Sequence, residues 1–177
     1  QIATLRDELP NVPLLALTAS ATPHVQQDIV HHLHFAKTSN IFQQSFARPN
    51  LSFSAFTQPQ KVNKLQQILQ SVPGSALVYC RNRKRTKEIA GLLHMQGIAA
   101  SYYHAGLTTA ERSQRQEDWI NNKVRVMVCT NAFGMGIDKP DVRCVVHMDV
   151  PDSLEAYYQE AGRAGRDSKK SYAVLLY

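Results

Sequence analysis

The sequence lacks any long hydrophobic run: no apolar stretch approaches the roughly 18 residues that a membrane-spanning helix needs. Its opening residues also lack the charged, apolar and small-residue pattern of a secretory signal peptide. These absences argue against a membrane-inserted or exported protein. We therefore expect a soluble, cytoplasmic one.

Cysteine is scarce, and its spacing argues against a metal site. Cys80, Cys129 and Cys144 are too far apart for a CxxC pair, and two of them lie inside apolar runs. We expect them to be reduced core thiols of an intracellular protein. The histidines within residues 31–34 do not share one helical face, so a solvated helix end is the better interpretation. No metal-binding residue is predicted.

What the sequence does have is a basic excess and enough apolar residues for one core. Lys and Arg number 20 against 14 Asp and Glu, which gives a net charge of +6. Such an excess favours polyanionic partners without proving one. With 177 residues, 44% of them hydrophobic, the chain can bury one core but hardly two. We expect one full domain with an appended piece.

From Ser75 onward, apolar runs alternate with helical patterns. The runs are apolar at consecutive positions, which suits strands covered by helices on both faces. The expected strands are 76–80, 99–104, 124–130, 144–148 and 172–176, and the expected helices are 62–69, 86–96, 108–120 and 152–161. The alternation predicts an α/β fold with a parallel sheet and a site at the carboxyl edge of its strands.

Two helix starts carry recognisable capping patterns. Thr108 with Glu111 has the spacing of a capping box, and Asp152 with Glu155 repeats that start signal after a proline. Both patterns predict where helices begin in the α/β region.

The residues before position 48 follow a different pattern. Residues 14–18 predict a strand, and Thr22-Pro23 predicts the N-cap and first position of a helix with one apolar face. The polar stretch 48–60, with two prolines, predicts a domain boundary. We therefore divide the chain into residues 1–46 and 47–177.

Five segments occur in order along this pattern. They are residues 18–22 (TASAT), 78–83 (VYCRNR), 103–107 (YHAGL), 130–138 (TNAFGMGID) and 159–167 (QEAGRAGRD). Together they resemble motifs III, IV, IVa, V and VI of superfamily 2 helicases, and of the RecQ family in particular. The resemblance covers essentially the whole chain. It implies that residues 47–177 form the second RecA-like lobe of such a helicase, preceded by a β-α remnant of the first lobe.

The last segment, motif VI, suits an anionic ligand. On a helix, Gln159, Arg163 and Arg166 would share one side until Gly162 and Gly165 interrupt it. A planar, permanently charged guanidinium can stabilise charge on the γ-phosphoryl oxygens of ATP. The resemblance makes Arg163 and Arg166 arginine fingers and places Gln159 at ATP. A solvated basic helix end is the alternative, in which the glycines make little sense.

Motif V combines a strand end with two glycines. Glycines let the backbone approach a phosphate closely, and Asp138 can accept a hydrogen bond from a ribose hydroxyl. The resemblance assigns Thr130 and Asn131 to the DNA backbone, and Gly136 and Asp138 to ATP. The spacing is not GxGxxG, which disfavours a dinucleotide fold. A purely structural turn stays as the alternative.

The remaining motifs would contact DNA or couple the lobes. Polar groups and open amides at strand ends can track a sugar-phosphate chain. The resemblance assigns four such residues to single-stranded DNA: Asn82, Arg83, His104 and Gly106. A structural histidine is the alternative for His104. It also assigns three motif III residues to coupling: Thr18, Ser20 and Thr22.

The sequence contains no GxxxxGK[ST] phosphate loop and no acidic Mg²⁺ motif. By resemblance, ATP with Mg²⁺ is held mainly by a preceding lobe, so this chain alone should not hydrolyse ATP. Zinc is expected only in a possible downstream domain. The implied parent is a 3′-to-5′ DNA helicase acting on single-stranded and partially duplex DNA. It would be nucleoid-associated in bacteria or nuclear in eukaryotes.

Two other functions stay open. An RNA helicase of DEAH or DEAD type is the first, although Gln159-Glu160 in place of His-Arg argues against DEAD. A non-catalytic nucleic-acid-binding adaptor is the second. Because a lone strand in residues 1–46 would leave unpaired edges, we also expect this segment to dock onto a neighbouring molecule.

Overall fold

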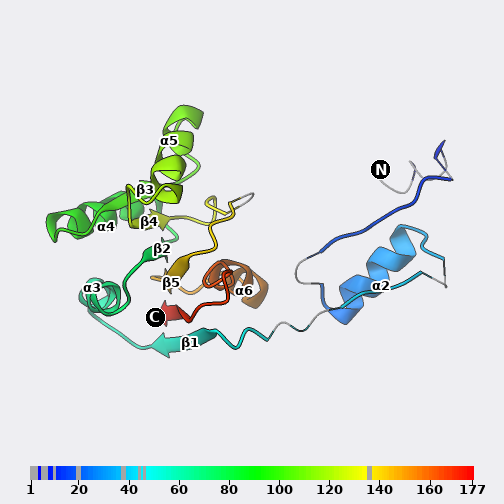
Figure 1. Cartoon of the computed structure of the whole chain (residues 1–177), viewed down its shortest axis with the longest axis horizontal. Coiled ribbons are helices and arrows are strands. Elements are labelled where there is room, and N and C mark those ends of the chain that lie inside the picture. The colour runs from blue at the N-terminus through cyan, green and yellow to red at the C-terminus, as the bar shows by residue number, and fades with distance from the viewer. Residues whose placement is uncertain are drawn as a thin grey trace. The chain divides into compact units, whose positions relative to one another are not determined.

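The computed structural model of the chain describes residues 4, 8–9, 11–18, 21–36, 39–43, 45, 47–134 and 137–177. The chain divides into two compact units, Gln1–Ala47 and Arg48–Tyr177 (Figure 1). Within the described ranges, no helix has both the length and the apolar character needed to cross a bilayer.

A six-stranded parallel sheet in the order β1-β6-β5-β2-β4-β3 forms the centre of the second unit. Its strands are β1 Leu51–Phe56, β2 Ser75–Tyr79, β3 Ala100–Tyr103, β4 Val126–Cys129, β5 Val142–His147 and β6 Ser171–Leu176. All five predicted strands are present, because runs that are apolar at every position can be buried on both faces of a sheet.

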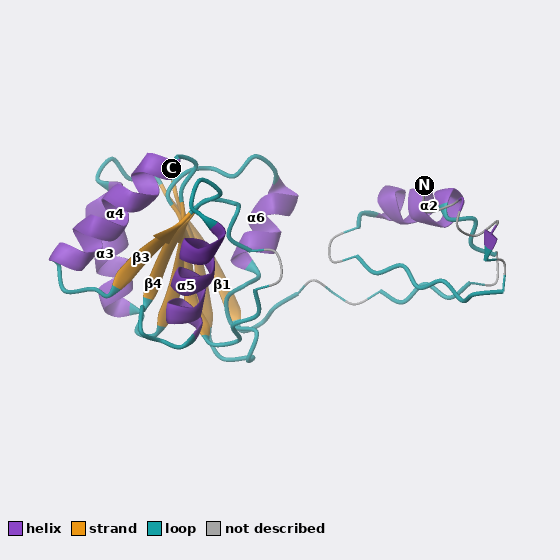
Figure 2. Cartoon of the chain, turned by 90° about the horizontal axis from the view of Figure 1, so that it is seen from above, coloured by secondary structure: helices purple, strands orange, loops and turns teal. Residues whose placement is uncertain are grey.

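Helices cover both faces of this sheet, which confirms the predicted layers (Figure 2). The helices are α3 Lys61–Ser71, α4 Arg83–Met95, α5 Thr109–Ile120 and α6 Leu154–Ala161. α3 and α4 pack on the face that carries Ala76 and Val78, whereas α5 and α6 pack on the face that carries Leu77 and Tyr79. Successive side chains of β2 therefore belong alternately to two separate hydrophobic clusters, one on each face of the sheet.

The capping pattern predicted one helix start correctly and missed another by one residue. The Thr108 N–H donates to Glu111 Oε2 at 2.9 Å, and Thr108 Oγ1 accepts from the Glu111 N–H at 3.3 Å, which completes a capping box. Asp152 does not cap α6. Its carboxylate accepts from Arg81 at 2.6 Å, and Ser153 caps the helix instead.

The stretch expected to be a boundary contains a strand. β1 pairs in parallel with β6, from Leu51 against Ser171 to Phe56 against Leu176. Leu51 is the buried residue of this edge strand, so its sequence lacks the continuous apolar run of the central strands. Pairing with the far end of the chain stabilises β1, and such pairing leaves little local signal.

The first unit contains helix α2, Pro23–His32. It begins as predicted, because Thr22 Oγ1 accepts from the Val25 N–H at 3.4 Å and proline occupies the first helical position. The strand predicted at residues 14–18 is wrong: this described segment forms no strand. A strand needs a hydrogen-bonded partner, and none is present among the described residues of this unit.

Candidate functional site

The two predicted arginines lie in a turn that follows α6. The helix ends at Ala161 with Gly162 as its C-cap, so Arg163 and Arg166 do not share a helical face with Gln159, contrary to the prediction. Gly165 adopts φ +63°, a left-handed conformation that reverses the chain and favours glycine. We call residues 162–167 the arginine loop.

Both guanidiniums reach the connection between β4 and β5, where motif V lies. Arg163 Nη1 donates to the carbonyl of Gly134 at 2.7 Å, and Arg166 Nη1 donates to the Asp138 carboxylate at 2.8 Å. The Arg163 guanidinium lies directly against Gly134, so a β-carbon there would displace it from this position. The structure therefore brings motifs V and VI together.

This junction does not lie at the carboxyl edge of the strands, where we expected the site. The Gly165 N–H donates to the carbonyl of Val142, the first residue of β5, at 2.9 Å. The loop is thus anchored at the amino ends of the strands, and its arginines line a small cavity with Leu77 and Trp119. The charged groups of this junction come from a turn after α6, whereas Asn82, His104 and Thr130 follow the carboxyl ends of β2, β3 and β4.

The charges at the junction suit an anionic ligand. Arg163 Nε is buried and has no hydrogen-bond partner within the described part of the chain. The Arg166–Asp138 pair is open, with side chains 38% and 80% exposed. An exposed pair of this kind contributes only about 0–1 kcal/mol, so Arg166 can exchange Asp138 for a phosphate at little cost.

The residues predicted to contact DNA lie at the other end of the sheet. Asn82 caps α4, since its Oδ1 accepts from the Lys84 N–H at 2.8 Å. A β-carbon on Gly106 would lie 3.2 Å from Arg83 Nη1, so motifs IV and IVa adjoin. His104 Nδ1 is buried and has no partner among the described residues. It is a polar atom that a ligand or water could satisfy.

Motif V spans the two ends. Thr130 follows β4 and is only 7% exposed, and its hydroxyl accepts from the Ala132 N–H at 3.4 Å. Asn131 is exposed and lines a pocket with Arg81, Asp149 and Glu160. The two carboxylates are engaged by Arg85 and His147. Asp138 lies at the arginine end of the same connection.

A buried polar cluster beneath motif V escaped the sequence reasoning. His147 Nε2 lies 2.9 Å from Glu160 Oε2, and the His147 ring stacks on Tyr79 with centroids 5.2 Å apart. The Tyr79 hydroxyl donates to the Phe133 carbonyl at 3.2 Å. Burial raises the pKa of Tyr79, which keeps this donor protonated. The available signal was His147 itself, a polar residue inside the apolar run 144–148.

The structure places three of the remaining predicted residues away from the junction, and two others lie outside the described residues. Thr22 caps α2, and Thr18 is exposed in the extended segment before it. Gln159 is exposed in the last turn of α6. Ser20 and Gly136 lie outside the described residues.

The cysteines are buried and unpaired. Burial raises the pKa of the Cys80 and Cys144 thiols to about 12, which removes their nucleophilic form at neutral pH. Within the described part of the chain, no group of three His, Cys, Asp or Glu side chains could hold a metal ion.

A parallel six-stranded sheet covered by helices on both faces is the architecture of a RecA-like lobe. The family described as helicase conserved C-terminal domain matches residues 60–168, more than half of the chain. The chain belongs to this family. Proteins named as RecQ helicases are among its relatives.

Three relatives show the relationship. The chain is 43% identical to the RecQ-like DNA helicase blm-1 of Caenorhabditis elegans and 42% identical to the ATP-dependent DNA helicase RecQ of Pasteurella multocida. It is also 43% identical to a putative ATP-dependent RNA helicase of Acanthamoeba polyphaga mimivirus. Each match covers 100% of this chain but 18%, 28% and 32% of the respective relative. The chain thus spans a third or less of their length.

Two solved structures share the fold. Saccharomyces cerevisiae Dbp5, bound to RNA and ADP BeF3, matches with a TM-score of 0.74 and 22% identity, covering 90% of this chain and 44% of that one. A DEAD box protein from Methanococcus jannaschii matches with a TM-score of 0.68 and 23% identity, covering 88% of this chain and 43% of that one.

Proposed function

We propose that this chain is the second motor lobe of an ATP-dependent, 3′-to-5′ DNA helicase of RecQ type. The observation that carries the proposal is the junction of the arginine loop with motif V. There, two guanidiniums from one loop meet the segment that leads back to the predicted DNA-binding residues.

In this proposal, Arg166 and Arg163 act on a nucleotide held mainly by the preceding lobe. Bound ATP, with Mg²⁺, supplies the phosphoryl group whose transfer to water drives the motor. Arg166 exchanges its exposed bond to Asp138 for phosphoryl oxygens. Arg163, held by its bond to the Gly134 carbonyl, adds a second positive charge nearby. Asp138, once released, can accept from a ribose hydroxyl. Gln159 is a further group of the same site.

The opposite end of the sheet would follow single-stranded DNA. Arg83 and the amide of Gly106 adjoin there, and contacts of this kind bind the backbone without reading bases. The exposed Asn131 would contribute beside them, with Thr130 fixing the turn. Relatives named as DNA helicases favour DNA over RNA. The relative named as an RNA helicase keeps RNA as the second candidate.

The partner of this lobe in the proposal is the first RecA-like lobe of the same protein, with residues 1–46 as its last part. Thr18, Ser20 and Thr22 would couple the two lobes. Because the chain lacks a phosphate loop, we propose that it does not hydrolyse ATP alone.

The arginine assignment can be tested in the intact protein. Arg166→Ala or Arg163→Ala should lower DNA-stimulated ATP turnover on the order of 10³-fold, because the transition-state charge loses its donor. Nucleotide affinity should change much less. Lys170→Ala, which removes an exposed cation outside the arginine loop, serves as the control. Near-normal turnover in both arginine variants would refute the proposal, and stimulation by RNA but not DNA would favour the second candidate.

A further inference from the structure

The second unit begins directly against the arginine loop. Arg48 is its first residue, and its guanidinium binds three backbone carbonyls of the loop. Nη1 donates to the carbonyl of Gly162 at 3.4 Å, and Nη2 donates to those of Ala164 and Gly165 at 3.1 and 2.7 Å. One planar donor fork therefore spans the backbone on both sides of Arg163.

Asn50 adds a second attachment two residues later. Its Nδ2 donates to the carbonyls of Gly165 and Lys169 at 2.8 and 3.0 Å, and its backbone carbonyl accepts from the Ser171 N–H at 2.8 Å. A β-carbon on Gly165 would lie 2.6 Å from Asn50 Nδ2. The loop and the Asn50 amide are thus packed without spare room.

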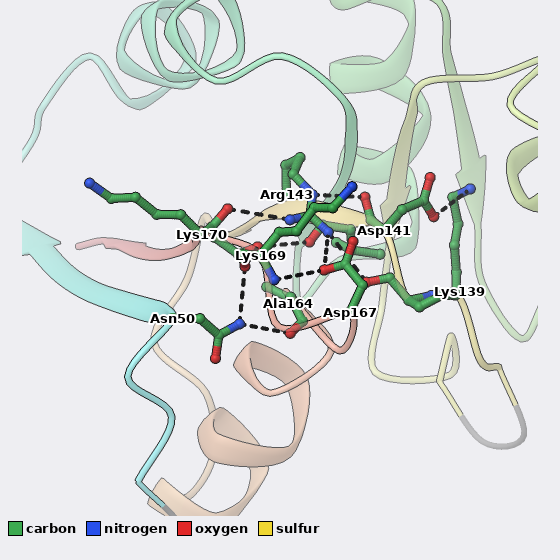
Figure 3. A network of polar contacts seen from close by, with 12 residues as sticks. Asn50, Lys139, Asp141, Arg143, Ala164, Asp167, Lys169 and Lys170 are labelled. Atoms are coloured by element: carbon green, nitrogen blue, oxygen red, sulfur yellow. Dashed lines mark hydrogen bonds and ion pairs between the residues drawn. The ribbon is translucent and has the colours of Figure 1, made fainter.

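Arg143 holds the far end of the loop (Figure 3). Its Nη2 lies 2.6 Å from Asp167 Oδ1, and the Asp167 N–H donates to the Pro140 carbonyl at 3.2 Å. This ion pair is largely buried, with side chains 16% and 21% exposed. The hydrogen bond from Arg143 is the main reason that the pKa of Asp167 is lowered. Residues 162–167 are therefore fixed at both ends.

These contacts have a consequence for the arginines. No helix orients Arg163 and Arg166, since α6 has ended before them. Their direction depends on where the loop backbone is held. A misplacement of about 1 Å at a reacting group can lower a rate by about 100-fold.

We propose that Arg48 and Asn50 are positioning residues that aim the arginine loop at the nucleotide. The inference rests on the proposed function, because it presumes that Arg163 and Arg166 act on ATP. It adds that the segment joining the two units is itself part of the machinery, and that Arg48 and Asn50 never touch the nucleotide.

A first experiment measures the loop itself, without nucleotide. In the 177-residue chain, Arg48→Ala should speed amide hydrogen exchange of Gly165 and Asp167 by roughly 10-fold, the effect of losing about one well-made hydrogen bond. Arg125→Ala is the matched control. Arg125 also donates to three backbone carbonyls, those of Leu69, Val72 and Gly74, but it holds the α3–β2 connection. Equal acceleration by both variants, or none by Arg48→Ala, would overturn the inference.

A second experiment measures turnover in the intact protein. Arg48→Ala should lower DNA-stimulated turnover by about 10- to 100-fold with little change in KM for ATP, because a misaimed loop weakens only the transition-state contact. Arg48→Lys should restore little of the loss, since a point charge cannot span the carbonyls. In a background with both Arg163→Ala and Arg166→Ala, Arg48→Ala should add less than about 3-fold, because the side chains that it positions are then absent.

The proposed function and the positioning role can be tested separately. If Arg166→Ala lowers turnover and Arg48→Ala does not, the positioning role is wrong and the proposed function stands. If Arg166→Ala and Arg163→Ala leave turnover intact, the proposed function is wrong. The positioning role, which depends on it, is then wrong as well. Full additivity of Arg48→Ala with the combined Arg163→Ala and Arg166→Ala changes, or full rescue by Arg48→Lys, would also reject positioning through the loop.

Discussion

The two units of the chain differ in what they bury. Residues 48–177 enclose two hydrophobic clusters, one on each face of the sheet. In residues 1–47, Ala21 is the one buried hydrophobic among the described positions. Several large apolar side chains there face solvent, among them Leu15 at 77%, Leu17 at 85% and Phe42 at 92% exposed.

The comparison shows that a well-formed helix start and a stable packed helix are different properties. α2 has a capped start with proline in place, yet none of its residues is buried. α5 begins with a full capping box and also buries Trp119 near its end. Capping selects where a helix begins, but burial of an apolar face supplies most of its stability in a folded domain. The second unit should therefore carry the cooperative unfolding transition.

The strongest test of this contrast is a pair of large-to-small substitutions. Trp119→Ala should lower the free energy of unfolding by about 3–5 kcal/mol, since it empties a fully enclosed site against Phe133. Leu17→Ala should change it by less than about 0.5 kcal/mol, as expected for an exposed position. Chemical denaturation followed by circular dichroism measures both. A similar loss from Leu17→Ala would show that the first unit shares the same core.

A finer test uses the two helix caps. Thr108→Ala removes half of a capping box and should cost about 1 kcal/mol of unfolding free energy. Thr22→Ala removes the same kind of bond from α2 and should leave the main transition where it is. Equal shifts in the denaturation midpoint would mean that both helices unfold with the sheet.

A third test removes the first unit altogether. Deletion of residues 1–46 should change the unfolding free energy of the lobe by less than about 1 kcal/mol, because Arg48 and everything it holds remain. The exposed apolar residues would be gone, so the truncated chain should be more monomeric if residues 1–46 dock onto a neighbouring molecule. Light scattering after size exclusion decides this. If the full-length and the truncated chain are both monomers at the same concentration, residues 1–46 do not dock onto a neighbouring molecule.

The sequence predicted the sheet well because its central strands are buried on both faces. A run such as residues 144–148 removes its side chains from water best as a central strand that is covered on both faces. The edge strand β1 was missed for the opposite reason: one buried residue leaves no periodic pattern, and its partner lies at the other end of the chain. The strand predicted at residues 14–18 failed because an apolar run alone cannot supply a pairing partner.

The candidate site was predictable in its chemistry but not in its geometry. The spacing of Arg163 and Arg166 suggested a shared helical face, whereas Gly162 ends the helix and the arginines project from a turn. Arg48 and Asn50 looked like part of a linker because their acceptors are backbone carbonyls more than a hundred positions away. Backbone acceptors leave no trace in composition or motif, so no pattern in the sequence pointed to them.

The bonds from Arg48 to the arginine loop, which we call the Arg48 clamp, also affect the order in which the lobe folds. Its bond to Gly165 closes a loop of 117 residues, and the β1–β6 pairing closes one of similar length. During synthesis, residue 48 leaves the ribosome long before residue 165 exists, so β1 and the clamp must wait for the last strand. The β2–β4 and β3–β4 pairs can form earlier. The loop that carries the two arginines is therefore among the last parts to acquire its final shape, and a prematurely ended chain would hold a partial sheet without it.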